Sequence, residues 1–283
     1  MLENQYLRYG LNALTRAHKL NYFEDGHRGA AIIAGVYFCR ENPVKAGVSE
    51  KIASIIDERW ASTKLCAPLP DEHPDPGLLR DVVDCTSEHL EGLREAGHNV
   101  IVPSLALKAL HDVPENITAS CVSGLCRLIS CFRVSDVPLA EDVQLPPLDD
   151  ESTFAEFVLD EFDRCVKRFT GRGQGWSGHL LTFAQALFDL REYGSPSVAR
   201  QAADGFRIYV RRVRLGPQPS DGKYDEHSRL QHYPLDLDYW EERKGDLRLG
   251  HKLKYPYGFY GLISKTREAA IKRRALETAH RIF

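Results

Sequence analysis

The dipeptide Gly-His occurs four times in this chain of 283 residues and marks an internal repeat. The histidines are His27, His98, His179 and His251, separated by 71, 81 and 72 residues. For a chain with 21 Gly and 11 His, chance alone would give about one such pair. The even spacing therefore predicts four copies of one structural unit.

Each Gly-His pair is followed by a stretch that is apolar on nearly every face. A helix without a polar face is typical of one that is surrounded by other helices. We therefore expect four inner helices, each led by a histidine. They cover residues 30–39, 100–110, 180–190 and 253–263.

Amphipathic segments flank each inner helix, and no segment shows the alternation of a β-strand. Helical periodicity predicts helices after the inner ones at 48–64, 115–132, 196–213 and 266–282. It predicts others before them at 3–20, 77–95, 151–169 and 236–246. The expected fold is all-α, with about twelve helices in a single domain over 1–283. Its four three-helix units are about 1–64, 77–132, 151–213 and 236–283.

Repeated helical units can stack as an open solenoid or close into a ring. An open array needs polar capping units at its ends, but the first inner helix is the most apolar of the four. We therefore expect a closed α-toroid around a central pocket. The long irregular segments 65–76, 133–150 and 214–235 fall between units, where loops would frame the mouth of that ring.

A glycine followed by histidine also has a local structural meaning. Glycine stops one helix and starts the next, which puts the histidine in the first turn. The positive end of the helix dipole disfavours imidazolium there, so the ring is expected to be neutral. Pro103 and Pro256 lie five residues after His98 and His251, where a kink would open space or adjust packing.

Four neutral imidazoles that face one cavity would form a metal-binding or catalytic pocket. We therefore take His27, His98, His179 and His251 as candidate catalytic residues and as candidate ligands of iron, copper or zinc. The alternative is that each histidine only caps its own helix. Aromatic and titratable residues close to the repeats are the candidates for substrate binding: Trp176, Tyr257, Tyr260, His227 and His232.

Composition narrows the class of protein. Seven cysteines without a CxxC pair indicate reduced thiols, not a disulfide scaffold. The longest apolar run has ten residues, about half of a bilayer crossing, and residues 1–5 show no secretory signal, so a soluble, cytoplasmic protein is expected. The segment 200–283 carries 18 basic and 11 acidic residues, but the two signs alternate, so we expect no binding to nucleic acid.

Apolar helices led by histidine resemble helical oxygenases of the questin-oxidase type. Repeated helices around an axis also resemble the α/α toroids of terpenoid cyclases and lanthionine synthetases. The Asp-rich motif of the cyclases has only Asp236-Leu237-Asp238 as a counterpart, and the Cys-Cys-His zinc set of the synthetases is absent. No residue role is transferred from these families.

The leading hypothesis is an intracellular enzyme with a histidine-lined pocket that acts on a small, partly apolar organic molecule. The chemistry would be acid-base or oxidative, with a metal-dependent oxidoreductase as one form. The alternative is a non-catalytic helical-repeat module, for binding or as a scaffold, in which Gly-His is a structural joint. The sequence indicates neither the substrate nor the oligomeric state.

Overall fold

Helices form all the regular secondary structure of the described residues. The computed structural model describes residues 2–225, 232–242 and 249–283. These ranges hold twelve α-helices and no strand, only isolated bridges between Arg94 and Val134 and between Arg172 and Lys223. The prediction of an all-α fold is therefore confirmed.

Each α-helix of the described residues overlaps one of the segments predicted from the sequence to be helical. Short 3₁₀ or π turns follow α3 and precede α4, α5 and α6. The bounds are α1 (Asn4–Ala17), α2 (Tyr22–Glu41), α3 (Val48–Ile56), α4 (Leu79–Glu88), α5 (His98–Asp112), α6 (Ala119–Cys131), α7 (Glu151–Arg168), α8 (Gln174–Tyr193), α9 (Pro196–Leu215), α10 (Leu237–Glu242), α11 (His251–Lys265) and α12 (Ala269–Ala279).

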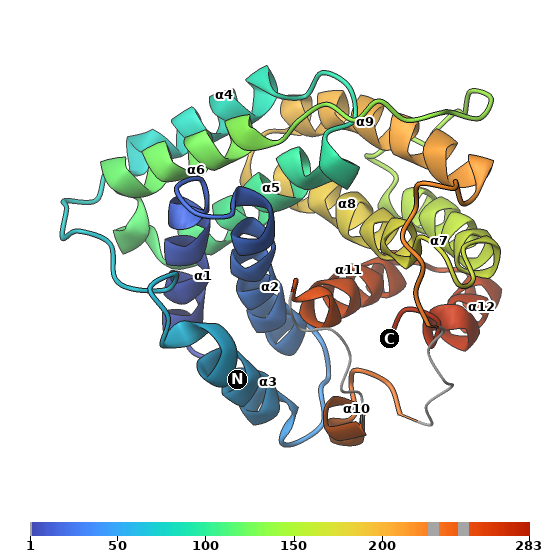
Figure 1. The fold of residues 1–283 in the computed structure, drawn as a ribbon, viewed down its shortest axis with the longest axis horizontal. Coiled ribbons are helices and arrows are strands. Elements are labelled where there is room, and N and C mark those ends of the chain that lie inside the picture. Colours follow the sequence, from blue (N-terminus) through green and yellow to red (C-terminus); the bar gives the residue numbers. More distant parts are fainter. Residues whose placement is uncertain (1, 226–231, 243–248) are drawn as a thin grey trace.

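Helices α2, α5, α8 and α11 are the inner helices and lie around a common centre (Figure 1). Each contacts two others of the set: α2 contacts α5 and α11, and α8 contacts α5 and α11. Outer helices pack against them, with α1 on α2 and both α7 and α9 on α8, while α12 packs on the outer helix α7.

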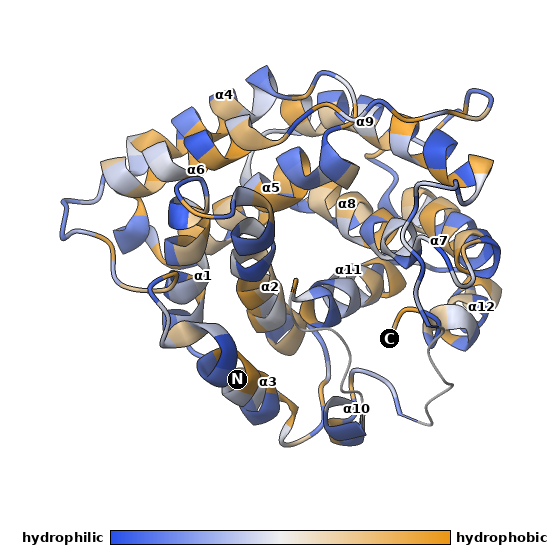
Figure 2. Ribbon diagram, viewed as in Figure 1, coloured by the Kyte–Doolittle hydropathy of each residue, from blue (hydrophilic) through white to orange (hydrophobic). Residues whose placement is uncertain are grey.

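Burial explains why the inner helices lack a polar face. Every residue in 29–39 of α2, 98–110 of α5 and 177–190 of α8 is buried. The outer helices bury one stripe only, as in α9, where Phe206, Tyr209 and Val210 face the core. Hydrophilic and hydrophobic residues accordingly alternate along α4, α6 and α9 (Figure 2).

The inner helices run in the same direction, because residues near their N-terminal ends meet at one place and residues near their C-terminal ends meet at another. The four Gly-His histidines mark the first end, which we call the histidine end. At the other end, Lys108 Nζ lies 4.6 Å from the centroid of the Tyr37 ring and 3.3 Å from Asp189 Oδ1. We call this the lysine end.

The expectation that every Gly-His pair starts a helix is correct for two of the four pairs. Gly97 and Gly250 are the N-caps of α5 and α11, with φ of 92° and 64°, a conformation that favours glycine. It is wrong for Gly26 and Gly178, which lie inside α2 and α8. These two helices begin about one turn earlier, so His27 and His179 lie in the second turn.

Gly178 is required for a different reason, which is close approach of another helix. A Cβ atom at this position would lie 2.2 Å from the ring of Tyr255 on α11. Pro103 and Pro256 lie inside α5 and α11, the two helices that begin at their histidine. Helices α2 and α8 thus begin about one turn before their histidine, whereas α5 and α11 begin at it.

Candidate functional site

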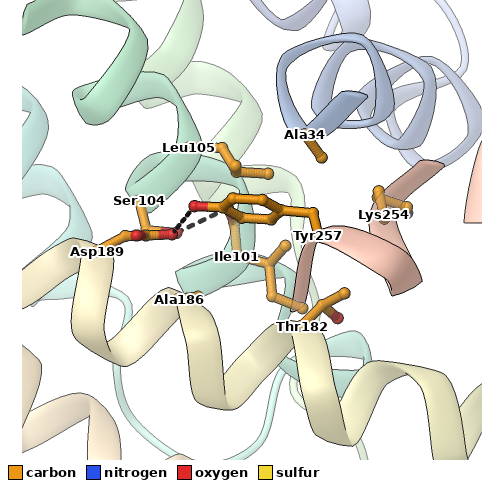
Figure 3. Close-up of a pocket in the computed structure, with 9 residues that line it drawn as sticks. All are labelled: Ala34, Ile101, Ser104, Leu105, Thr182, Ala186, Asp189, Lys254 and Tyr257. Carbon is orange, nitrogen blue, oxygen red and sulfur yellow. Dashed lines mark hydrogen bonds between the residues drawn. The ribbon is translucent and has the colours of Figure 1, made fainter. Parts of the chain in front are cut away.

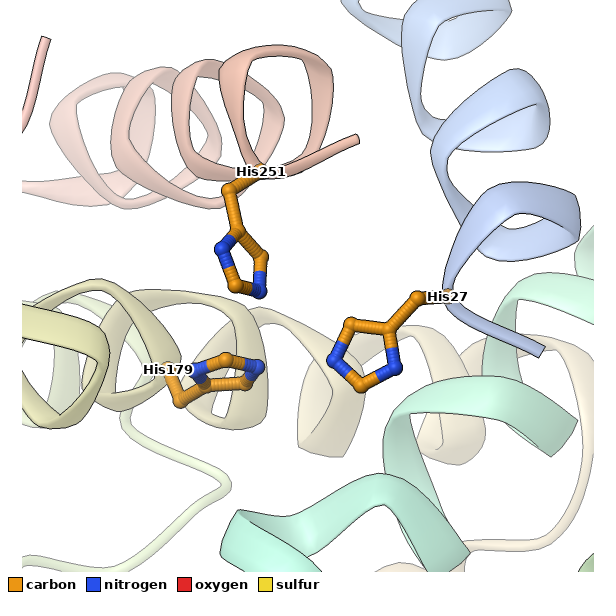
Figure 4. Close-up of side chains that lie close together, drawn as sticks. All are labelled: His27, His179 and His251. Atoms are coloured by element: carbon orange, nitrogen blue, oxygen red, sulfur yellow. The ribbon is translucent and has the colours of Figure 1, made fainter. Parts of the chain in front are cut away.

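The four Gly-His histidines meet at the histidine end of the inner helices. Ring centroids lie 4.1 Å apart for His27 and His98, 4.7 Å for His98 and His179, and 5.0 Å for His179 and His251. The rings of His251 and His27 are 5.3 Å apart. Figure 4 shows His27, His179 and His251 pointing toward one another from α2, α8 and α11. Residues that are distant in sequence thus share one space.

Backbone carbonyls fix the orientation of three of these rings. His27 Nδ1 lies 2.7 Å from Phe23 O, and His179 Nδ1 lies 2.7 Å from Gly175 O. His98 Nδ1 is bonded to Glu95 O in the same way. A carbonyl can only accept, so each Nδ1 carries the proton and each Nε2 presents a lone pair. This is how metal-ligating histidines are held.

The Nε2 atoms that face the shared space lack hydrogen-bond donors. His27 Nε2 and His251 Nε2 are buried and have no hydrogen-bond partner among the described residues. His98 Nε2 and His179 Nε2 lie 3.2 Å apart, although both are acceptors in the tautomer set by their carbonyls. Two lone pairs at this distance repel unless a proton or a metal ion lies at them. The cluster therefore has lone pairs that a cation could bind.

Burial keeps the rings neutral. It lowers the pKa of His27, His98 and His251 well below the ordinary value, and it lowers the pKa of His179 to about 3. A positive charge on Lys254 would act on all four rings in the same direction. The sequence analysis also expected neutral imidazoles, and burial is the largest cause of the lowered pKa values.

Three of the histidines have the arrangement of a metal site. Ligand nitrogens of His27, His179 and His251 all lie within 4.8 Å of one another. Nitrogens that share a tetrahedral metal at about 2.0–2.1 Å are about 3.3 Å apart, so modest rotation of the rings would close the site. An all-imidazole set suits zinc, copper, iron or nickel.

A depression of about 650 Å³ leads from the surface to this cluster. His27, His98, His179 and His251 all line it, together with Phe23 and Trp176 and segments from two of the long irregular regions. Those segments include Ser135 and Val137 from one region and residues 221–224 from the other. The wall is thus partly apolar and wide enough for a small organic molecule.

Two polar groups on the wall are held firmly. Trp176 Nε1 donates to Asp221 Oδ1 at 2.9 Å, and Arg212 Nη2 donates to both carboxylate oxygens of Asp221 at 2.9 and 2.7 Å. Tyr22 Oη donates to Glu95 Oε1 at 2.7 Å. These pairs position the ring of Trp176 and the carboxylate of Glu95 beside the cluster.

The turn that leads into His98 is strained. Glu95 and Ala96 have φ of 40° and 60°, and Gly97 follows with 92°. Left-handed conformations cost about 1–2 kcal/mol for residues other than glycine. Such outliers gather at functional sites, where the surrounding structure imposes them. Here the strained turn places Glu95 O under His98 Nδ1.

An internal cavity lies along the inner helices and is shown in Figure 3. Its volume is about 10 Å³, close to the space that one water needs. All four inner helices line it, and its polar residues are Ser104, Thr182, Asp189, Lys254 and Tyr257. Tyr257 Oη donates to Asp189 Oδ2 at 2.6 Å, so this tyrosine lies in the internal cavity and not among the residues that line the depression.

The other residues predicted to bind substrate are placed as follows. Trp176 lines the depression. The ring of Tyr260 packs against Phe38, 5.8 Å between centroids, and is not among the lining residues. His232 lies beside Asp238, 3.5 Å between Nδ1 and Oδ2, and is also outside the lining. His227 falls outside the described residues.

Sequence analysis did not single out Lys254, Lys108 or Asp189. All three are buried in the inner helices. A charged residue inside a segment that is otherwise apolar on every face was the available signal, and it applies to each of them. Glu95 stands three residues before a Gly-His histidine, a spacing that can place two metal ligands on one helix face, but it was not taken into the expected site.

Comparison with known protein families, curated proteins and solved structures finds no match. No helix among the described residues is both long and apolar enough to cross a bilayer. What the site can do must therefore be argued from its own geometry.

Proposed function

We propose that this protein is a metal-dependent enzyme in which His27, His179 and His251 hold a transition metal. The observation that carries the proposal is the convergence of their ligand nitrogens within 4.8 Å of one another, with two Nε2 atoms lacking any partner in the described part of the chain. Three histidines leave a metal position open for water, dioxygen or substrate. His98 stands next to this set and is a candidate to accept or donate a proton.

The shape of the depression supports a small, partly apolar organic substrate. Phe23 and Trp176 offer ring surfaces, while Glu95 and Asp221 add polar groups that could orient a ligand. Iron or copper would support oxidative chemistry at this site, and zinc would support acid-base chemistry through a bound water.

Metal analysis after purification without chelators is the direct test. We expect about one iron, copper or zinc ion per chain, and at least about a 100-fold loss of metal affinity in His27→Ala, His179→Ala and His251→Ala. His232→Ala, which changes a histidine outside the depression, is the control and should bind metal normally. Substoichiometric metal that cannot be restored by reconstitution would refute the proposal.

The second candidate is a non-catalytic helical-repeat module in which Gly-His is a structural joint. The observation in its favour is that Gly97 and Gly250 do cap α5 and α11 in the left-handed conformation. In that case Gly97→Ala would unfold the protein, while the histidine variants would keep both stability and any ligand binding.

The proposal includes a closed α-toroid built from four three-helix units in a single domain. It is supported by the contacts of each inner helix with two others of the set. We also propose a cytoplasmic protein that acts on a small molecule and binds neither nucleic acid nor a membrane. The alternation of basic and acidic residues in 200–283 supports the absence of a nucleic-acid surface.

A further inference from the structure

Lys254 has the least satisfied side chain among the buried lysines of the described chain. The residue is 1% exposed, and Nζ has no hydrogen-bond partner within the ranges described. Lys108 provides the contrast, because its equally buried Nζ lies 2.6 Å from Glu41 Oε1, 3.3 Å from Asp189 Oδ1 and 2.9 Å from Tyr257 Oη. A buried ammonium without an anion is strongly disfavoured.

No carboxylate of the described residues pairs with Lys254. Asp189 is the one acidic residue that lines the same internal cavity. Its carboxylate already accepts from Tyr257 Oη at 2.6 Å, Lys108 Nζ at 3.3 Å and Gln185 Nε2 at 3.0 Å. Burial lowers the pKa of Lys254 well below its ordinary value, which favours the neutral amine with its lone pair.

Lys254 lines the internal cavity and lies one helical turn beyond His251 on α11. Lys254 follows His251 by three residues on α11, which places the two on one face of the helix. Its charge would act on all four imidazoles, and for His27, His179 and His251 it is the largest charge effect. The residues three positions after the other histidines are Ala30, Ile101 and Thr182. Lys254 is therefore the one residue at these four positions that has a side-chain nitrogen.

We infer that Lys254 Nζ is a fourth nitrogen ligand of the metal held by His27, His179 and His251. The inference rests on the proposed metal site. Four neutral nitrogen donors form a set suited to copper, zinc, nickel or iron. Coordination would also satisfy the lone pair that the fold leaves without a donor, and it explains why a lysine is buried at this position.

The test compares metal affinity in Lys254→Met and the wild-type protein. Met has a similar volume and length but no amine. Zinc affinity measured by competition with a chromophoric chelator should fall at least about 100-fold in Lys254→Met. Lys252→Met is the matched control, because Lys252 lies on the same helix and its Nζ contacts Trp240 O at 3.5 Å; its zinc affinity should stay within about threefold of wild type.

A spectroscopic readout distinguishes coordination from a structural role. With Cu²⁺ bound, electron paramagnetic resonance should show one nitrogen fewer in Lys254→Met than in the wild type, and circular dichroism should show that both are folded. If Lys254 were an ammonium outside the coordination sphere, its removal would raise metal affinity, because a repelling charge would be lost.

Equal or tighter binding in Lys254→Met, or an unchanged nitrogen count, would therefore overturn the role of Lys254 while leaving the histidine site intact. Absence of zinc and copper binding in the wild type would overturn the metal site itself, and this inference with it. Should Lys254→Met fail to fold, Lys254→Gln in the same two measurements gives the answer, since an amide nitrogen does not replace the amine as a donor.

Discussion

The two ends of the inner helices bury polar groups in opposite ways. At the lysine end, Lys108, Glu41, Asp189 and Tyr257 satisfy one another with hydrogen bonds and ion pairs. At the histidine end, His27 and His251 and the nearby amine of Lys254 have nitrogens without partners in the described chain. A network that is complete serves the fold. Buried nitrogens without partners, by contrast, are free to bind a ligand or a metal ion.

Lowering the pH should change the unfolding free energy more than any of the substitutions below, because it acts on the neutral rings at the histidine end. Below about pH 6.5 a histidine of the unfolded chain binds a proton, whereas the buried rings of His27, His98 and His179 stay neutral because their pKa values are lowered. Unfolding therefore takes up protons, and the unfolding free energy falls as the pH falls. Between pH 7 and 5 each of the three should cost about 2 kcal/mol of unfolding free energy in the metal-free protein.

Urea unfolding at pH 7, 6 and 5 measures this dependence. The variant His27→Gln should show a shallower slope, because one neutral imidazole is removed. A pH-independent unfolding free energy over this range would mean that the rings are protonated in the folded state.

Breaking the complete network at the lysine end should be the next largest effect. Lys108→Met removes the cation that faces Asp189 and Glu41, and leaves a buried carboxylate without its charge partner. Loss of one member of such a pair costs about 3–5 kcal/mol. Chemical denaturation should show this loss, and Lys108→Met combined with Asp189→Asn should recover part of it. A loss below about 1 kcal/mol would contradict the pairing.

Gly178→Ala tests the close packing that brings α8 and α11 together at the histidine end. The new Cβ would lie 2.2 Å from the Tyr255 ring, so the helices must separate. Overpacking of this kind costs about 1–3 kcal/mol and should also weaken metal binding through His179. The control is Gly222→Ala, where a Cβ would meet nothing within 4 Å. Equal thermal stability of the two variants would argue against the contact.

Lys254→Met should have the smallest effect on stability, and its sign should be opposite to that of Lys108→Met. Removing a buried amine without partners should stabilise the metal-free protein by about 1–2 kcal/mol. Differential scanning calorimetry without metal would show a raised Tm. A lowered Tm would indicate that Lys254 has a stabilising partner in the folded state.

Sequence reasoning gave the fold class and the positions of the helices, because both follow from local periodicity and from the repeat. Convergence of the Gly-His histidines was also predictable, since each was expected near the start of an inner helix. Sequence reasoning did not reveal that His27 and His179 lie one turn inside their helices. For His27, the position depends on the start of α2, where the Asn21 side chain accepts from Glu24 N at 3.1 Å, a cap the repeat alone does not specify.

The substrate-side residues were harder to place. Tyr257 was expected on the pocket, but the direction of its ring depends on Asp189, which is 68 residues away in sequence. Pairings of this kind are set by the relative rotation of two helices about their axes. A single sequence contains no measure of that rotation.

The common direction of the inner helices has a consequence for the architecture of the whole chain. Neighbouring helices that run the same way cannot be joined by a tight turn, because the chain must first travel back along the full length of the helix it has just completed. Outer helices such as α3, α6 and α9 begin those return paths. The interval of 71–81 residues between successive histidines therefore contains one inner helix and the chain that returns to the histidine end.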